Sequence, residues 1–227
     1  MTVSFVGAAS AEATSLTLPT HQAGDLLIMF AWNGGSLTVP TVPSGWDIVR
    51  IVSRSTGANR TGVVAFRSAT SAATTSGTWT NAALLGCVVY RDDTTHITIG
   101  AENLQQDINS TAFVYGGFSA FDNVGTAAKL RKTSAWVIGI GGANSNSQAL
   151  ETPPAGMTNR LNRAGASTNE ISIHDTNAAV SSYAGGNTTL AATTVGSSIT
   201  LEVFDTGIAK ASAGMLIHPG MSGGMRG

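Results

Sequence analysis

Leu26-Leu27-Ile28-Met29-Phe30-Ala31-Trp32 is an apolar run bounded by Gly24-Asp25 before it and by Asn33-Gly34-Gly35 after it. A membrane-spanning helix needs about 20 apolar residues, so this run is too short to cross a bilayer. A short apolar run between turn signals is typical of a strand that is buried on both faces. The stretch from Gly24 to Trp46, which closes on Pro43-Ser44-Gly45-Trp46, therefore predicts the centre of a β-sandwich.

A second stretch repeats this arrangement later in the chain. Ser134-Ala135-Trp136-Val137-Ile138-Gly139-Ile140 is followed by Pro153-Pro154-Ala155-Gly156-Met157, as the first run is followed by Pro43-Ser44-Gly45-Trp46. Two further pairs of stretches correspond in the same order: Glu170–Asp175 with Gly62–Arg67, and Ser198–Asp205 with Leu84–Arg91. The correspondence is one of order, because the loops between the stretches differ in length.

The repeat divides the chain into two pseudo-repeated halves, at about 14–91 and 134–205, with residues 92–133 joining them. Two sets of strands can form two tandem sandwiches or interleave into one jelly roll. Each half has few strands and would bury its own core poorly. We therefore predict one all-β domain over residues 1–206, a jelly-roll-like β-sandwich, followed by an extended glycine-rich C-terminal tail over 207–227.

Shorter patterns predict the remaining elements. Asp47–Arg54 alternates for part of its length, which indicates a strand with one face buried and with Arg50 and Arg54 pointing outward. Within 92–133, Ala101–Ser110 is polar and is predicted to be a loop, and Ala127–Lys132 fits a helical turn. This segment is either an interdomain linker or a crossover inside one sandwich, and its aromatic residues favour the crossover. Four short stretches have the composition of strands: Thr2–Ala8, Ser15–Pro19, His96–Ile99 and Ala112–Tyr115.

Composition narrows the class of partner. Only 11% of the 227 residues are charged, against about 25% in an ordinary soluble domain. A net charge of -1 and a pI near 6.4 leave no basic patch, so neither nucleic-acid binding nor membrane insertion is expected. A weakly charged surface favours burial against partner subunits, including further copies of the chain, and the alternative is a secreted Ser/Thr-rich sandwich. The amino end lacks the pattern of a signal peptide, so Sec export is not expected.

Motifs for catalysis are weak throughout the sequence. Gly220-Met221-Ser222-Gly223-Gly224 has the spacing of a nucleophilic serine, but that motif needs a strand before it and a helix after it. Gly139–Gly142 follows a predicted strand, yet no helix pattern opens after it to bind a phosphate. Asp92-Asp93 fits a solvated turn better than a cation site. Cys87 lies alone in an apolar run and is predicted to be a small core residue. The histidines lack the close spacing of a metal site: His21, His96, His174 and His218. We therefore predict a protein that is not an enzyme and that holds no cofactor and no metal.

Two sets of residues are candidates for binding. The tail carries apolar side chains that suit docking into a groove or onto a sheet edge of a neighbour, although it could instead fold back on its own domain. These docking residues are Met215, Leu216, Ile217, Met221 and Met225. Jelly rolls also serve as lectins, so Trp79, the better exposed candidate, and Trp46 could stack on a host surface glycan. Trp32 and Trp136 lie in or beside the apolar runs and are predicted to be core residues.

Four stretches in order carry a resemblance: Gly24–Leu27, Pro43–Trp46, Val64–Ala69 and Val88–Arg91. Together with Pro153–Gly156 and the glycine-rich end, they resemble a jelly-roll family that is common among structural proteins of tailed phages. The resemblance implies a virion protein, assembled in the host cytoplasm, such as a head-decoration, spike or tail accessory subunit. Its expected partners are other virion proteins, either capsid or tail subunits, and further copies of itself. A carbohydrate-binding module for host recognition is the alternative.

Overall fold

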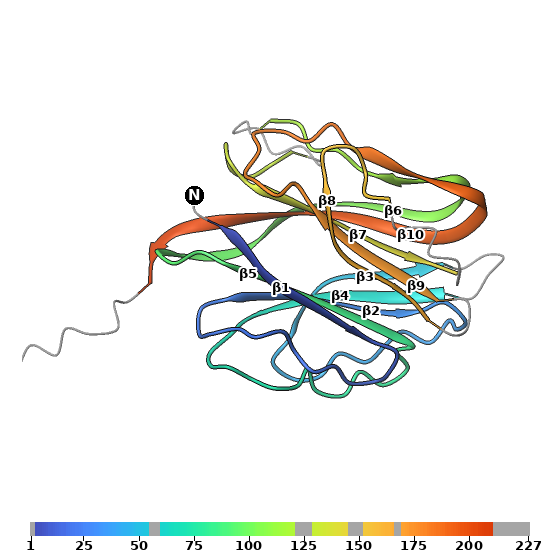
Figure 1. Cartoon of the computed structure of the whole chain (residues 1–227), viewed down its shortest axis with the longest axis horizontal. Coiled ribbons are helices and arrows are strands. Elements are labelled where there is room, and N and C mark those ends of the chain that lie inside the picture. The colour runs from blue at the N-terminus through green and yellow to red at the C-terminus, as the bar shows by residue number, and fades with distance from the viewer. Residues whose placement is uncertain (1–2, 55–59, 121–128, 145–151, 166–168, 211–227) are drawn as a thin grey trace, which may run out of the picture.

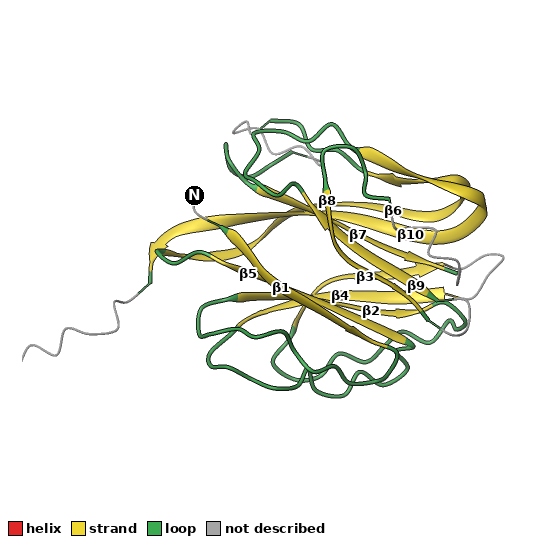
Figure 2. Ribbon diagram, in the orientation of Figure 1, coloured by secondary structure: helices red, strands yellow, loops and turns green. Residues whose placement is uncertain are grey.

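The computed structural model describes residues 3–54, 60–120, 129–144, 152–165 and 169–210, which form two stacked antiparallel sheets (Figures 1 and 2). None of these residues is helical, so the all-β prediction is confirmed. The first sheet contains β1 (Ser4–Ala11), β2 (Leu26–Asn33), β3 (Asp47–Arg54), β4 (Arg60–Ser68) and β5 (Leu84–Arg91). The second sheet contains β6 (Thr95–Tyr115), β7 (Trp136–Ala143), β8 (Thr158–Ala164), β9 (Glu170–Asp175) and β10 (Gly186–Ala209).

The two sheets have the same strand order. The first runs β1-β5-β2-β4-β3 and the second runs β6-β10-β7-β9-β8, so residues 4–91 build one sheet and residues 95–209 build the other. Strand β1 therefore precedes the first predicted repeat, and β6 lies in the segment that was predicted to join the repeats. The jelly-roll part of the prediction is not confirmed, because β2 and β7 each find hydrogen-bonding partners on both sides within their own half. Across the core, β1 contacts β8, β5 contacts β9 and β3 contacts β6. These contacts relate the two halves by a pseudo-twofold axis.

The central strands β2 and β7 are buried on both faces, as their apolar runs predict. Leu26, Ile28 and Phe30 of β2 point into the core between the sheets. Leu27 and Met29 point the other way, into a second apolar cluster on the outer face of the first sheet. Loops cover the outer face of each sheet (Figure 2), which explains why both faces of the strands are apolar.

The glycines of β7 make room for two large aromatic rings. A Cβ on Gly142 would lie 2.6 Å from ring atoms of Trp32, which crosses the core from β2. On the outer face, a Cβ on Gly139 or Gly141 would lie 2.9 Å or 2.3 Å from Tyr115. The run Gly139–Gly142 therefore has a packing role, because glycine alone leaves space for an aromatic side chain against the strand.

A turn and a bulge recur at matching places in the two halves. Gly45 has φ +84° and Gly156 has φ +77°, so both Pro-x-Gly turns use the left-handed conformation that glycine adopts without strain. Directly after each turn, the edge strand has a bulge against its neighbour, at Val49 in β3 and at Arg160 in β8. The turn and the bulge align the two edge strands, so that each residue of β3 has an equivalent residue in β8.

The prediction of one loop and the prediction of one strand are wrong. Ala101–Ser110 was expected to be a loop but belongs to β6, which pairs with β10 along most of its length. Backbone pairing to β10 holds this polar segment extended, and an edge strand does not need apolar residues. Ser15–Pro19 contains only an isolated bridge, Thr17 to Thr75, because it crosses the outer face of the first sheet. Of the predicted helical turn at Ala127–Lys132, residues 129–132 are not helical and the others lie outside the described residues.

The end of the chain is described only to residue 210. Strand β10 continues to Ala209, so the first three residues assigned to the tail belong to the sheet. Lys210 then donates a backbone hydrogen bond to Thr94 at 3.0 Å. The docking residues predicted in the tail, from Met215 to Met225, lie outside the described residues, and their role stays a prediction.

Candidate interaction surface

A buried polar cluster joins the sheets at one corner of the sandwich. The Tyr90 hydroxyl donates to Asp175 Oδ2 at 2.8 Å, and Arg160 Nε donates to the same oxygen at 2.8 Å. The Arg160 guanidinium also lies 4.4 Å from the ring centroid of Phe5. Burial, followed by the charge of Asp175, raises the pKa of Tyr90 well above its ordinary value. The tyrosine is therefore a permanent hydrogen-bond donor, and the cluster fastens β5 and β1 to β9 and β8.

At the opposite corner of the sandwich, apolar side chains occupy the equivalent positions. Val49, Phe66, Ile99 and Val203 stand at the register positions of Arg160, Asp175, Phe5 and Tyr90, and all four pack on the central core. The same structural task is thus done without polar groups. This comparison indicates that the polar corner, like the apolar one, holds the two sheets together.

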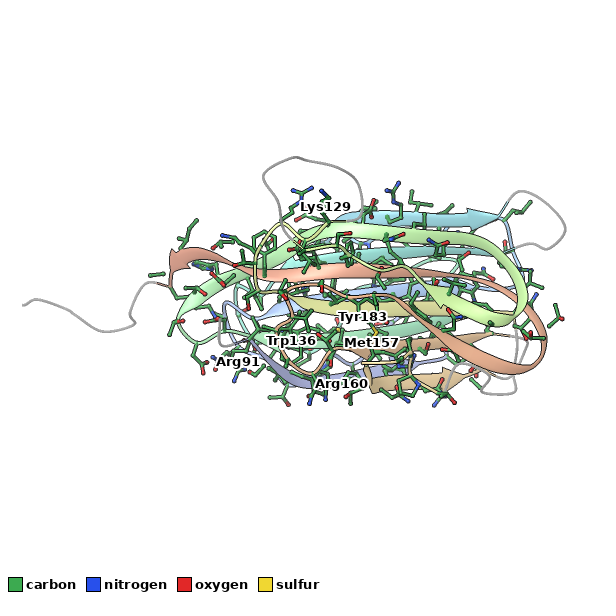
Figure 3. The ribbon with its side chains drawn as sticks, turned by 90° about the horizontal axis from the view of Figure 1, so that it is seen from above. Arg91, Lys129, Trp136, Met157, Arg160 and Tyr183 are labelled. Atoms are coloured by element: carbon green, nitrogen blue, oxygen red, sulfur yellow. The ribbon has the colours of Figure 1, made fainter. Side chains whose placement is uncertain are left out.

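A second buried polar layer lies on the outer face of the second sheet. Figure 3 views the molecule from the side of this sheet. The Tyr115 hydroxyl lies 3.3 Å from Ser172 Oγ, and its ring makes an edge contact with His174 at 5.8 Å between centroids. Neither ring nitrogen of His174 has a hydrogen-bond partner among the described residues. Serine and histidine therefore do not form the hydrogen-bonded pair that a serine nucleophile requires.

Burial gives His174 a pH-dependent effect on stability. Desolvation lowers its pKa from 6.5 to about 4, so the unfolded chain binds a proton more readily than the folded chain. The stability that this residue confers is complete above pH 6.5 and falls by about 3 kcal/mol as the pH drops to 4. We expect urea titrations of His174→Phe to lose this slope, and those of His96→Gln, an exposed histidine, to keep it. Parallel curves for the wild type and His174→Phe would contradict the prediction.

The predicted glycan-stacking residues are buried. Trp79 is fully inaccessible and Trp46 is 7% exposed, and their rings make an edge contact at 5.5 Å. Both indole nitrogens donate to the carbonyl of Ser76, at 3.0 Å from Trp46 and 3.3 Å from Trp79. The prediction that Trp79 is exposed is wrong, because the loop around it folds over the outer face of the first sheet. The lectin alternative thus loses its stacking surfaces, while Trp32 and Trp136 are core residues as predicted.

The remaining candidate residues also have structural roles. Cys87 is buried as predicted, and desolvation raises its pKa to about 12. Asp92 Oδ1 accepts hydrogen bonds from the backbone of Thr94 and Thr95, at 2.8 and 3.0 Å, and so shapes the turn between β5 and β6. The ring of His21 links two loops: its Nδ1 lies 2.7 Å from the carbonyl oxygen of Pro19, and its Nε2 accepts a hydrogen bond from the backbone N–H of Ala73 at 3.1 Å.

The motif residues of the first half contact one another in pairs. Arg91 donates to both carboxylate oxygens of Asp25, at 2.8 and 2.7 Å, and Asp25 is fully buried. The Arg67 guanidinium lies 4.5 Å from the ring of Trp46. The first contact joins Gly24–Leu27 to Val88–Arg91, and the second joins Pro43–Trp46 to Val64–Ala69, so these motifs have structural roles in the first sheet.

Strand β3 presents apolar side chains to solvent. Ile48 and Ile51 are 52% and 43% exposed and lie on its outer side, beside Ala65 and Val63 of β4. We call these two residues with the free backbone edge of β3 the β3 edge surface. Leu37 is also exposed and lies in a loop. The next residue, Thr38, holds this loop to β4, because its carbonyl accepts a hydrogen bond from the Thr61 hydroxyl at 2.9 Å.

The alternation of β3 predicted a different arrangement. Arg50 is exposed, as expected, but its register places it on the core side, and it forms an ion pair with Glu102 of β6 in the other sheet. Ile48 and Ile51 share the outer face of the sheet, where both are exposed. The bulge at Val49 interrupts the alternation, so that Ile48 and Ile51, three residues apart, lie on the same face of the sheet. The side chain of Arg54 lies outside the description.

The equivalent positions on β8 are polar. Asn159 and Asn162 take the places of Ile48 and Ile51 on the free edge of the second sheet. Exposed edge strands invite pairing with another chain, and polar side chains discourage it. Within one molecule, therefore, β8 is a protected edge and β3 is an unprotected one.

Comparison of the chain with models of known families, with curated proteins and with solved structures gives no match. Among the described residues, no helix is long and apolar enough to cross a membrane. The same part of the chain holds no group of three or more His, Cys, Asp or Glu side chains placed to bind a metal ion. We take the β3 edge surface as the candidate functional site, because it combines an edge strand with two exposed isoleucines on one face.

Proposed function

We propose that this chain is a non-enzymatic structural subunit of a tailed-phage particle, assembled in the host cytoplasm. It acts as an exterior head-decoration or cement protein, or as a spike or tail accessory subunit. It binds capsid or tail proteins through the surface of its sandwich and through its C-terminal tail. In this proposal the fold is a jelly-roll-like relative of phage sandwich proteins, with one sheet from each half.

The observation that carries the proposal is the β3 edge surface. An edge strand with two exposed isoleucines is a liability for a protein that remains free in solution. A subunit that is covered by neighbours would bury these side chains. Because each isoleucine is already about half buried, covering it would contribute about 0.7–1.5 kcal/mol, half of the value for a fully exposed side chain. The low charge of the chain, 11% of its residues, supports the same conclusion.

The buried polar groups support a scaffold rather than a catalyst. Asp175 and Tyr90 are enclosed between the sheets, and His174 and Ser172 are enclosed beneath loops. A catalytic group must reach its substrate within hydrogen-bond distance. Each of these groups instead packs against another part of the chain, so function through the exposed surface is the better account.

Incorporation into particles tests the proposal. We expect the full chain to co-purify with phage particles in fixed stoichiometry, as measured by quantitative mass spectrometry. Truncation from Gly214 onward should reduce incorporation at least about tenfold if the tail is a docking arm, because that corresponds to about 1.4 kcal/mol of binding energy. Undiminished incorporation would remove the tail from the proposal. A full-length chain that never associates with particles would contradict the proposed function itself.

A further inference from the structure

Among the described residues, no strand pairs with the outer edge of β3. In the first sheet β3 is the outermost strand, and within the described part of the chain it pairs only with β4. Asp47, Ile48, Arg50 and Ile51 are all exposed along it. Extended peptides can add to such an edge, where backbone hydrogen bonds supply affinity and the side chains supply specificity.

The sequence of β3 is complementary to itself in the antiparallel direction. When two copies of β3 pair about a twofold axis at Ile51, the two Ile51 residues lie opposite each other on the outer face. The bulge at Val49 adds one residue, and it brings Asp47 at one end level with Arg54 at the other end of the second strand. Opposite charges at both ends favour this register, since directly opposed charges of opposite sign stabilise paired strands.

The equivalent edge strand of the second sheet, β8, lacks this complementarity. The corresponding residues of β8 are Thr158 for Asp47, and Asn159 and Asn162 for the isoleucines, so they offer neither the charge nor the apolar pair. A second copy of the chain therefore fits β3 better than it fits β8. It also fits better than a partner of one charge sign, because each copy of β3 carries an acidic residue at one end and a basic residue at the other.

We propose that two copies of this chain associate through antiparallel pairing of their β3 strands, so that the two first sheets form one continuous sheet across a twofold axis. The inference rests on the proposed function in naming the partner of the same surface. Purified chain alone tests it, so the two can fail separately. A dimer that is not incorporated into particles contradicts only the proposed function, and incorporation of a monomer contradicts only the dimer.

The decisive experiment combines sedimentation with charge exchange. Asp47→Arg and Arg54→Asp should each weaken the dimer at least about tenfold, and the double variant should recover most of that loss, because the two charges have exchanged ends. Ile51→Lys should also raise the dissociation constant at least about tenfold. Asn162→Lys is the matched control on β8 and should leave association unchanged. Thermal unfolding of each variant verifies that the fold is retained.

Cross-linking checks the register independently. Side chains opposite each other in an antiparallel pair have Cβ atoms about 4.5–5.5 Å apart, so Ile51→Cys should form an intermolecular disulfide on mild oxidation. Cys87 is buried and does not compete. Asn162→Cys should not cross-link. A chain that stays monomeric at the highest concentration reached would overturn the proposal. So would a dimer that forms equally well with Ile51→Lys, or whose double charge variant is no better than the single ones.

Discussion

Asp175→Ala is expected to lower the free energy of unfolding by about 3–5 kcal/mol, which is the range for breaking a buried charged pair. The substitution leaves the fully buried Tyr90 hydroxyl without its acceptor and removes the carboxylate that binds Arg160. Urea denaturation followed by tryptophan fluorescence measures the loss. Asp93→Ala, in an exposed turn position, is the control and should change stability by less than about 0.5 kcal/mol.

The apolar corner of the sandwich suggests how to repair that loss. Combining Asp175→Phe with Arg160→Val and Tyr90→Val copies Phe66, Val49 and Val203 into the polar corner. Apolar replacements of a buried ion pair are often neutral or stabilising. We expect the triple variant to regain most of the stability that Asp175→Ala loses. An Asp175→Ala variant that loses less than about 1 kcal/mol would show that the corner contributes little.

Gly142→Ala is expected to destabilise the protein by about 1–3 kcal/mol, the usual cost of overpacking a core. The new methyl group would lie 2.6 Å from Trp32, whose indole is fully buried and donates to the carbonyl of Ala143 at 3.2 Å. Because the ring is held in this way, the methyl group cannot be accommodated by a small rotation. Denaturation midpoints at constant m-value measure the effect.

Gly35→Ala provides the matched control for this prediction. No atom lies within 4 Å of a Cβ on Gly35, and its backbone is not in the left-handed region. Its substitution should be neutral or slightly stabilising, since alanine reduces the conformational entropy of the unfolded chain. Equal stability of the two variants would mean that the core around Trp32 has more space than the contacts indicate.

Sequence patterns predicted the elements that are buried on two faces. The runs at Leu26–Trp32 and Trp136–Ile140 lie within β2 and β7, the middle strands of the two sheets, and Glu170–Asp175 coincides with β9. Continuous apolar runs are readable because core burial selects every residue in them. The repeated order of strands was likewise visible, since each half solves the same packing problem with similar residues.

Long-range pairing and loop placement could not be read in this way. The polar stretch of β6 is a strand only because β10 pairs with it, and nothing local favours that conformation. Trp79 stands between threonines, so its burial depends on how a loop folds over a distant strand. Ile48 and Ile51 resemble core residues until the sheet order shows that β3 is an edge. The apolar residues of the tail, which were the leading docking candidates, lie outside the described part of the chain.

The difference between β3 and β8 determines whether association through these two edge strands can continue beyond a dimer. If the repeat were symmetrical, with isoleucines at 159 and 162 as well, each molecule would carry two adhesive edges. Head-to-tail addition through two such edges would have no natural stopping point, and molecules joined in this way would extend into fibres. In the proposed pairing, the two asparagines of β8 leave β3 as the adhesive one of these two equivalent edges, so that association through them would end with a closed pair.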